Sequence, residues 1–235
     1  MGMRGRVAPR PLDEVADAAG RVFVEKGYRG AGISDVAGRL GLSHGALYTY
    51  VRSKEALLHL VLLRAVEPGS LDELPLPVAG ADPERIVALA RTWADTHATL
   101  PVLAAACRRR TMPVADELVA VVDELYGFVE RNRLLLALVE RCAADLPELA
   151  TLHFVERRRE LVGRLATYLR RRIRSGHLRP VPDVDAAARF VVETVAWFAW
   201  HRREDPDSAM LGDDAARTTV HDLVPAAFLL PGGAA

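Results

Sequence analysis

Hydroxyl, aromatic and basic side chains gather in residues 34–54, on both sides of a glycine. Such groups donate hydrogen bonds to phosphate oxygens, and the start of a helix attracts anions as well. Lys54 is expected at the start of a helix, because Ser53 before it is a candidate N-cap. A lysine there opposes the helix dipole but suits a phosphate. The segment therefore predicts contacts to a nucleic-acid backbone.

An apolar stripe predicts the first helix of this segment. Val36, Ala37 and Leu40 recur at helical spacing, which indicates a short amphipathic helix from about Ile33 to Leu40. Gly41 follows directly. Glycine adopts the left-handed conformation at a helix end without a Cβ penalty, so we expect the helix to end there and the chain to turn.

A second helix is predicted from the N-cap candidate Ser43 to about Tyr50. Leu47 points inward, whereas His44 and Tyr48, four residues apart, share the opposite face. The two residues after His44 are small, which lets the backbone approach a partner closely. Three packed helices without any ligand would explain the apolar pattern equally well. The polar and aromatic outer face favours DNA binding over packing alone.

The motifs of the first 60 residues resemble a known family. They comprise residues 15–28, Ile33 with Val36-Ala37, and Leu42 to Tyr50 with Ser53-Lys54-Glu55. From Val15 to Leu58 the chain resembles the N-terminal domain of the TetR family of transcriptional regulators. The resemblance implies a recognition helix, and it implies DNA contacts at the matching positions, which are Ser34, Ser43, His44, Gly45, Ala46, Tyr48, Thr49, Tyr50 and Lys54.

One position departs from the family pattern. Family members carry threonine or serine where this chain has Ala31 and Gly32, and that hydroxyl both caps a helix and touches a phosphate. Glycine is a tolerable cap, at a cost of a few tenths of a kcal/mol. Either the phosphate contact is missing or Ser34 takes it over. A small-molecule binding protein with a degenerate DNA-binding domain is therefore the alternative function.

Composition separates a basic head from an acidic body. Residues 1–60 hold nine Lys or Arg against six Asp or Glu, although the whole chain of 235 residues has no formal net charge. A DNA-binding head on a body that does not bind DNA fits this division. Two cysteines, no visible secretory signal and no long apolar run predict a cytoplasmic protein without membrane contact.

Helical patterns continue to the C-terminus, so we expect an all-α fold. An N-terminal three-helix helix-turn-helix domain, residues 11–60, precedes a larger helical bundle for ligand binding and dimerisation, residues 61–235. Residues 1–10, with three arginines, form a basic arm that is either a solvated tail or a minor-groove contact. One further helix is expected to begin at Pro83, and a long helix is expected to end at about Cys142. Others are expected from Pro147 to Gly176, over 185–203 and over 213–230.

The helix over 185–203 is apolar around nearly its whole circumference. Such a helix must be buried on two sides, and in a bundle of this size one side can face a partner subunit. We therefore expect a homodimer. A dimer places two recognition helices about one DNA turn apart, or a multiple of it, so its operator is palindromic.

The resemblance also implies a small-molecule effector that enters the helical body and releases a repressor from DNA. Aromatic and polar side chains are candidates to line the pocket, with core or dimer packing as the alternative: Trp93, Tyr126, His153, Phe154 and Trp197. Histidines and cysteines are scattered without metal-ligand spacing, and no nucleophile elbow or phosphate loop appears. We expect no enzyme activity, catalytic residue, metal or cofactor.

Overall fold

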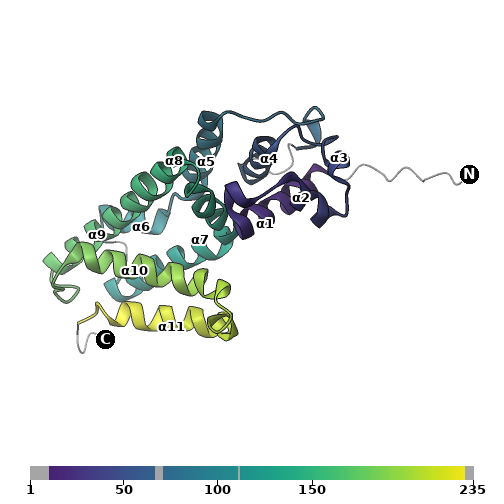
Figure 1. The fold of residues 1–235 in the computed structure, drawn as a ribbon. Coiled ribbons are helices and arrows are strands. Elements are labelled where there is room, and N and C mark those ends of the chain that lie inside the picture. Colours follow the sequence, from purple (N-terminus) through teal and green to yellow (C-terminus); the bar gives the residue numbers. More distant parts are fainter. Residues whose placement is uncertain (1–10, 67–70, 111, 231–235) are drawn as a thin grey trace, which may run out of the picture. The chain divides into compact units, whose positions relative to one another are not determined.

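The computed structural model describes residues 11–66, 71–110 and 112–230, and helices are its regular elements (Figure 1). Within these ranges no strand forms, and one isolated parallel bridge joins Val51 to Val78. The all-α prediction is confirmed. The predicted basic arm, residues 1–10, lies outside the described residues. No helix in the described part of the chain is long and apolar enough to cross a membrane.

The described residues divide into two compact units. The first runs up to Thr96 and takes in Ala137–His153, and the second combines His97–Leu136 with the residues from Phe154 onward. Helix α7 (Val114–Ala143) contributes residues to both units. The predicted functional boundary at residue 60 stays a prediction.

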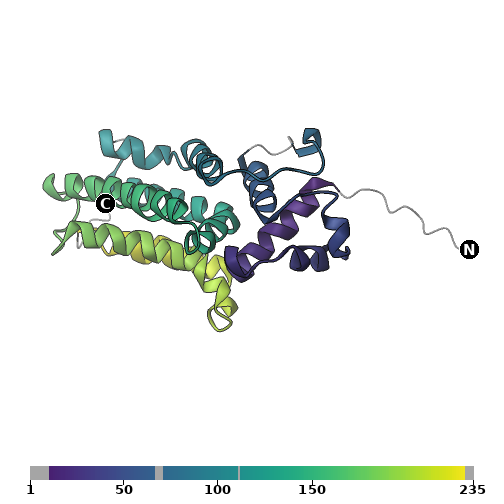
Figure 2. The same cartoon turned by 45° about the horizontal axis from the view of Figure 1, so that its top comes forward.

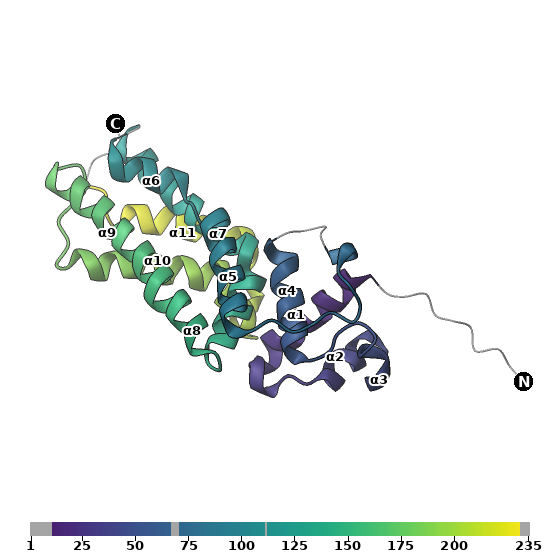
Figure 3. The ribbon, with the colours of Figure 1, turned by 90° about the horizontal axis from the view of Figure 1, so that it is seen from above.

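The first unit holds the helix-turn-helix segment. Besides part of α7, its elements in chain order are α1 (Leu12–Gly30), α2 (Ile33–Leu40), α3 (His44–Leu47), α4 (Lys54–Val66), the 3-10 turn η1 (Leu71–Glu73), α5 (Pro83–His97) and α8 (Pro147–Ala150). Helix α1 packs against both α2 and α4, and α2 packs against α3 (Figure 3). The buried face of α1 includes Val15, Ala19, Val22 and Phe23. Helix α1 thus supports α2 and α4 directly, and it supports α3 through α2.

The second unit is a helical bundle. Besides α7 it contains α6 (Pro101–Arg108), most of the π-helical segment η2 (Thr151–Arg158), α9 (Arg159–Arg174), α10 (Val184–Ala199), the 3-10 turns η3 (His201–Glu204) and η4 (Ser208–Met210), and α11 (Asp213–Ala226). Helix α10 packs against α9 and α11, and α6 packs against α9 (Figure 2). The helix predicted over 185–203 ends at Ala199, because Trp200 leaves the helical region with φ −138° and ψ −69°.

A buried ion pair lies within the core of the second unit. The side chains of Arg172 on α9 and Glu117 on α7 are 4% and 0% exposed, and Arg172 Nη2 lies 2.6 Å from Glu117 Oε1. Arg172 also donates to the carbonyl of Ala106, at the end of α6, over 3.0 Å. One guanidinium thus joins three helices. Because both charges are removed from water, each depends on the other for compensation.

Loss of one partner of this pair is expected to destabilise the fold strongly. Glu117→Gln should lower the free energy of unfolding by about 3 kcal/mol or more, since Arg172 would then be a buried charge without its counter-ion. Denaturant unfolding measures this. The control is Arg189→Ala, which removes an exposed pair with Glu193 and should cost less than about 1 kcal/mol. Equal effects of the two substitutions would contradict the role given to the buried pair.

Candidate DNA-binding site

The turn between α2 and α3 is built as the sequence predicts. Gly41 has φ 66° and ψ 26°, the left-handed conformation. The Leu42 N–H donates to the Ala37 carbonyl over 2.8 Å, so the last carbonyls of α2 remain paired while the chain reverses. An added Cβ at Gly41 would meet no atom within 4 Å, so backbone conformation and not space favours glycine here.

Helix α3 begins where expected and is shorter than predicted. The Ser43 hydroxyl accepts a hydrogen bond from the Ala46 N–H over 3.2 Å, which confirms the predicted N-cap. The helix ends at Leu47 instead of Tyr50. Over the next residues the Thr49 N–H bonds to the Ala46 carbonyl and the Tyr50 N–H to the Leu47 carbonyl, a tighter i to i+3 pattern. The predicted helix therefore continues as turns.

Three predicted contact residues form an exposed cluster on α2 and α3. Ser34 Oγ and His44 Nδ1 lie 2.8 Å apart and share a hydrogen bond. The rings of His44 and Tyr48 meet edge to face, with centroids 5.2 Å apart. We call Ser34, His44 and Tyr48 the recognition cluster. Because Ser34 engages Nδ1, the second ring nitrogen of His44, Nε2, is the atom oriented for a further partner.

The remaining residues predicted on α3 divide by exposure. Ser43, Gly45 and Thr49 are exposed, and Ala46 is half-buried. The Thr49 hydroxyl donates to the Ala46 carbonyl over 2.7 Å, so it is oriented by the helix that precedes it. Leu47 is fully buried and anchors the segment on the core. The predicted outer and inner faces of this segment therefore match the structure.

Tyr50 lies differently from the other predicted contacts. Its side chain is only 8% exposed. Its carbonyl accepts a hydrogen bond from Val78 N–H over 2.7 Å, and Arg52 N–H donates to the Val78 carbonyl over 3.0 Å. The segment after η1 thus pairs with the chain just after α3. This burial does not favour a direct contact between the Tyr50 side chain and DNA.

Lys54 has partners within the protein. Its Nζ donates to the Tyr28 carbonyl over 2.9 Å and lies 4.6 Å from the centroid of the Tyr28 ring. A lysine ammonium near the carbonyls at a helix C-terminus interacts favourably with the helix dipole. Lys54 is thus at the N-terminus of α4 and at the C-terminal end of α1. Its predicted phosphate contact would add to this structural role.

Sequence reasoning missed the residues that hold the start of α2. Asp35 accepts from the Gly32 N–H over 3.0 Å, so a carboxylate closes the helix start although Gly32 has no hydroxyl. Asp35 also pairs with Lys26 over 2.7 Å. Hydrogen bonds from Lys26 and from the Gly32 backbone lower the pKa of Asp35. An acidic residue three positions after a cap was the available signal.

Tyr28 and Glu55 form a second contact that the sequence patterns do not reveal. The Tyr28 hydroxyl donates to Glu55 Oε1 over 2.9 Å. Burial raises the pKa of Tyr28, and the carboxylate of Glu55 raises it further. The pKa of Glu55 is lowered, chiefly by a hydrogen bond from Ser53. This pair connects the end of α1 to the start of α4.

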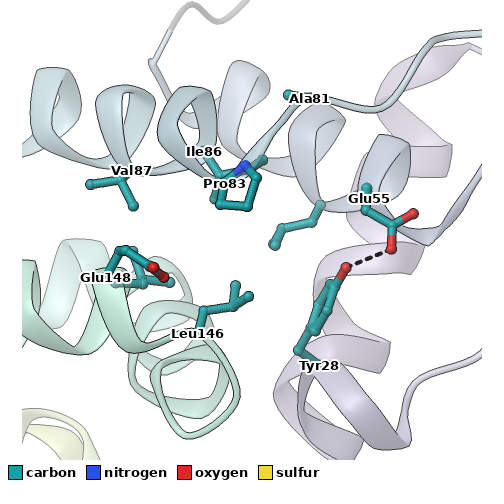
Figure 4. A pocket seen from close by; sticks show the side chains of 10 residues that line it. Tyr28, Glu55, Ala81, Pro83, Ile86, Val87, Leu146 and Glu148 are labelled. Atoms are coloured by element: carbon teal, nitrogen blue, oxygen red, sulfur yellow. Dashed lines mark hydrogen bonds between the residues drawn. The ribbon is translucent and has the colours of Figure 1, made fainter.

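A small pocket of about 50 Å³ adjoins Tyr28 within the first unit (Figure 4). Its lining consists of Tyr28, Glu55, Leu58, Ala81, Pro83, Ile86, Val87, Leu146, Glu148 and Leu149. Sites for drug-sized ligands span roughly 300–1,000 Å³. The pocket is therefore too small, as it stands, for an effector of that size.

The predicted ligand-pocket residues are divided between the two units. Trp93 and His153 belong to the first unit, and Tyr126, Phe154 and Trp197 to the second. Tyr126 is buried, with its hydroxyl 3.4 Å from the Phe198 carbonyl, whereas Phe154 and Trp197 are 39% and 41% exposed. None of the five lines the pocket beside Tyr28. Their role in ligand binding stays a prediction. Among the described side chains, no group of three metal-binding types is arranged to hold a metal ion.

Comparison with known proteins agrees with this arrangement. Residues 15–61 match the family model described as bacterial regulatory proteins, tetR family. No curated protein matches the chain. Among solved structures, the chain is similar to the ketosteroid transcriptional regulator KstR2 of Mycobacterium tuberculosis, with 17% identity over 96% of this chain and 98% of that chain and a TM-score of 0.57.

Two further solved structures share the fold. A TetR-family transcriptional regulator, PfmR from Thermus thermophilus, is 25% identical over 90% of this chain and 97% of its own, with a TM-score of 0.51. A tetR-family regulatory protein from Rhodococcus RHA1 is 17% identical over 93% and 97%, with a TM-score of 0.54. Residues 15–61 are thus an N-terminal domain of the tetR family of bacterial regulatory proteins, and the chain has the all-α fold of that family's transcriptional regulators.

Proposed function

We propose that this protein is a homodimeric, ligand-responsive transcriptional regulator that represses from a palindromic operator in the cytoplasm and has no enzyme activity. The recognition cluster carries the proposal. Ser34 and His44 are exposed and hydrogen-bonded to each other, while the opposite sides of their helices are buried in the core. A polar, preorganised outer face on a short helix is what base recognition requires.

The chemistry of this face suits DNA in two ways. An imidazole nitrogen and a tyrosine hydroxyl can reach base edges or phosphates, and both are oriented here by neighbouring side chains. Gly45 is exposed, and an added Cβ there would meet no atom within 4 Å. The open backbone at Gly45 lets a duplex approach α3 closely.

Helix α10 supports the proposed dimer. Its buried face comprises Ala188, Val191, Val192, Val195 and Ala199. Phe190 and Trp197, seven residues apart on one face of the helix, are 52% and 41% exposed. Large exposed aromatic side chains at helical spacing are typical of a surface that a partner covers. A second copy of this chain is the partner we propose.

The proposed effector enters the helical body and weakens DNA binding. Trp93, Tyr126, His153 and Phe154 remain the candidate contacts, whereas Trp197 is assigned to the dimer face. By thermodynamic linkage, an effector that lowers the affinity of the dimer for its operator must itself bind more weakly to the operator-bound dimer. This reciprocity distinguishes a regulator from a protein that only carries a small molecule.

Selection of bound duplexes from random DNA tests the proposed function. The purified chain should enrich a palindrome, and His44→Ala should change the preferred base pair at symmetric positions, because a lost base contact costs about 1–3 kcal/mol of discrimination. Tyr48→Phe is the companion, since it keeps the ring against His44 and removes only the hydroxyl. If no palindrome is enriched at low salt, the chain is instead a small-molecule binding protein with a degenerate DNA-binding domain.

Lys54 is expected to reveal its phosphate contact through salt dependence. Lys54→Met should reduce the slope of log affinity against log salt for the selected duplex by about one, because one phosphate fewer is neutralised. The control is Lys26→Met, whose amine pairs with Asp35 in the same head. If the affinity falls but the salt slope does not change, Lys54 does not contact a phosphate, and its role is the hydrogen bond to the Tyr28 carbonyl.

The dimer is tested by placing a charge on the exposed face of α10. Trp197→Glu should convert the dimer to a monomer in analytical ultracentrifugation, since it places a carboxylate in an apolar interface. Met210→Glu makes the same change of charge at a residue that is 86% exposed on η4, and it should leave the dimer intact. A Trp197→Glu protein that sediments as the wild type does would rule out this face.

A further inference from the structure

The corner between α1 and α2 is rich in glycine. Three glycines, Gly27, Gly30 and Gly32, lie within it, and Gly27 adopts φ 72°. Glycine has the largest conformational freedom of any residue, so a corner rich in glycine needs external partners to hold one position. This corner leads directly into α2, which carries Ser34 of the recognition cluster.

Two of those partners come from the helix-turn-helix segment itself. Lys54 Nζ donates to the Tyr28 carbonyl, and the Asp35 carboxylate accepts from the Gly32 N–H. Asp35 is 3 positions from Gly32 and Lys54 is 26 positions from Tyr28, so both partners belong to the same N-terminal segment as the corner. Neither of these two contacts therefore connects the corner to the α7–α8 turn.

A third partner comes from the turn between α7 and α8. The Arg29 N–H donates to Asp145 Oδ2 over 2.7 Å, across 116 positions of sequence. The Arg29 guanidinium also approaches Asp145, with Nε to Oδ1 at 3.4 Å, but its side chain is 83% exposed whereas that of Asp145 is 15% exposed. Solvent screens the guanidinium pair, so the backbone bond is the stronger restraint.

Asp145 is itself held in place. Its own N–H and that of Leu146 both donate to the Cys142 carbonyl, each over 3.0 Å, and so close the end of α7. Cys142 is fully buried. The carboxylate is therefore fixed to the end of α7, and any displacement of this helix end carries it along.

We propose that Asp145 is a positioning residue through which the α7–α8 turn sets the α1–α2 corner and thereby the DNA affinity of the recognition cluster. The proposal rests on the proposed DNA-binding function. Only Ala31, Gly32 and Ile33 separate the α1 end from Ser34. Gly32 has no side chain to cap α2, so the corner depends on its contacts with Asp35, Lys54 and Asp145.

The test compares Asp145→Ala with Asp145→Asn and with Glu148→Ala. Glu148 is an exposed carboxylate on α8, close to Asp145 in sequence, and serves as the charge-matched control. Dissociation constants are measured for the duplex that the wild-type chain selects, at a temperature where circular dichroism shows every variant folded. Amide hydrogen exchange is followed over residues 27–47 in the absence of DNA.

We expect Asp145→Ala to bind the duplex about tenfold more weakly, as loss of one charge-assisted hydrogen bond allows. Amide exchange should accelerate at Arg29 and through α2, with no matching change in α9 or α10. Asp145→Asn keeps an acceptor oxygen and should lie between Asp145→Ala and wild type. Glu148→Ala should bind and exchange as wild type does.

Two results would overturn the proposal. One is wild-type affinity in folded Asp145→Ala, and the other is faster exchange spread evenly over the chain, which marks general destabilisation. If the wild-type chain selects no duplex, the proposed function fails, and the exchange pattern alone then decides whether Asp145 positions the corner. Unchanged exchange over residues 27–47 in Asp145→Ala would exclude that role.

Discussion

The apolar face that α1 buries against α4 is the contact on which the assembly of the candidate DNA-binding surface depends. Helix α3 has four residues, far fewer than an isolated helix needs in water. It persists because Leu47 is fully buried and α3 packs against α2, which in turn packs against α1. The geometry of Ser34, His44 and Tyr48 is therefore a property of tertiary packing, and local helix propensity contributes little to it.

Local signals predicted the helix-turn-helix well. Gly41 and Ser43 have their expected roles because a left-handed helix end and an N-cap are decided by a few neighbouring residues. The inward side of α3 followed from the spacing of its apolar residues. Tyr50 was harder to predict, since its backbone pairs with Val78, 28 positions further along the chain, and its side chain is buried.

The sequence patterns could not predict contacts between residues that are far apart in the chain. Asp145 meets Arg29 across 116 positions, and no periodicity or motif links the two. Aromatic and polar character alone indicates the predicted ligand residues, and these residues are divided between two units. Composition identifies side chains suited to a pocket, whereas only the fold decides which of them meet. Lys54 shows the same limit, because its partner at the end of α1 depends on how the helices pack.

The first unit is discontinuous in sequence, since it includes Ala137–His153 as well as the N-terminal residues. An exchange of N-terminal domains between proteins of this fold must take this second segment into account. A chimaera joined near residue 60 would place a foreign α1 against the native α7–α8 turn and could lose the acceptor for the amide at position 29. A head transplanted together with its own Ala137–His153 segment would keep that contact and carry its restraint into the new protein.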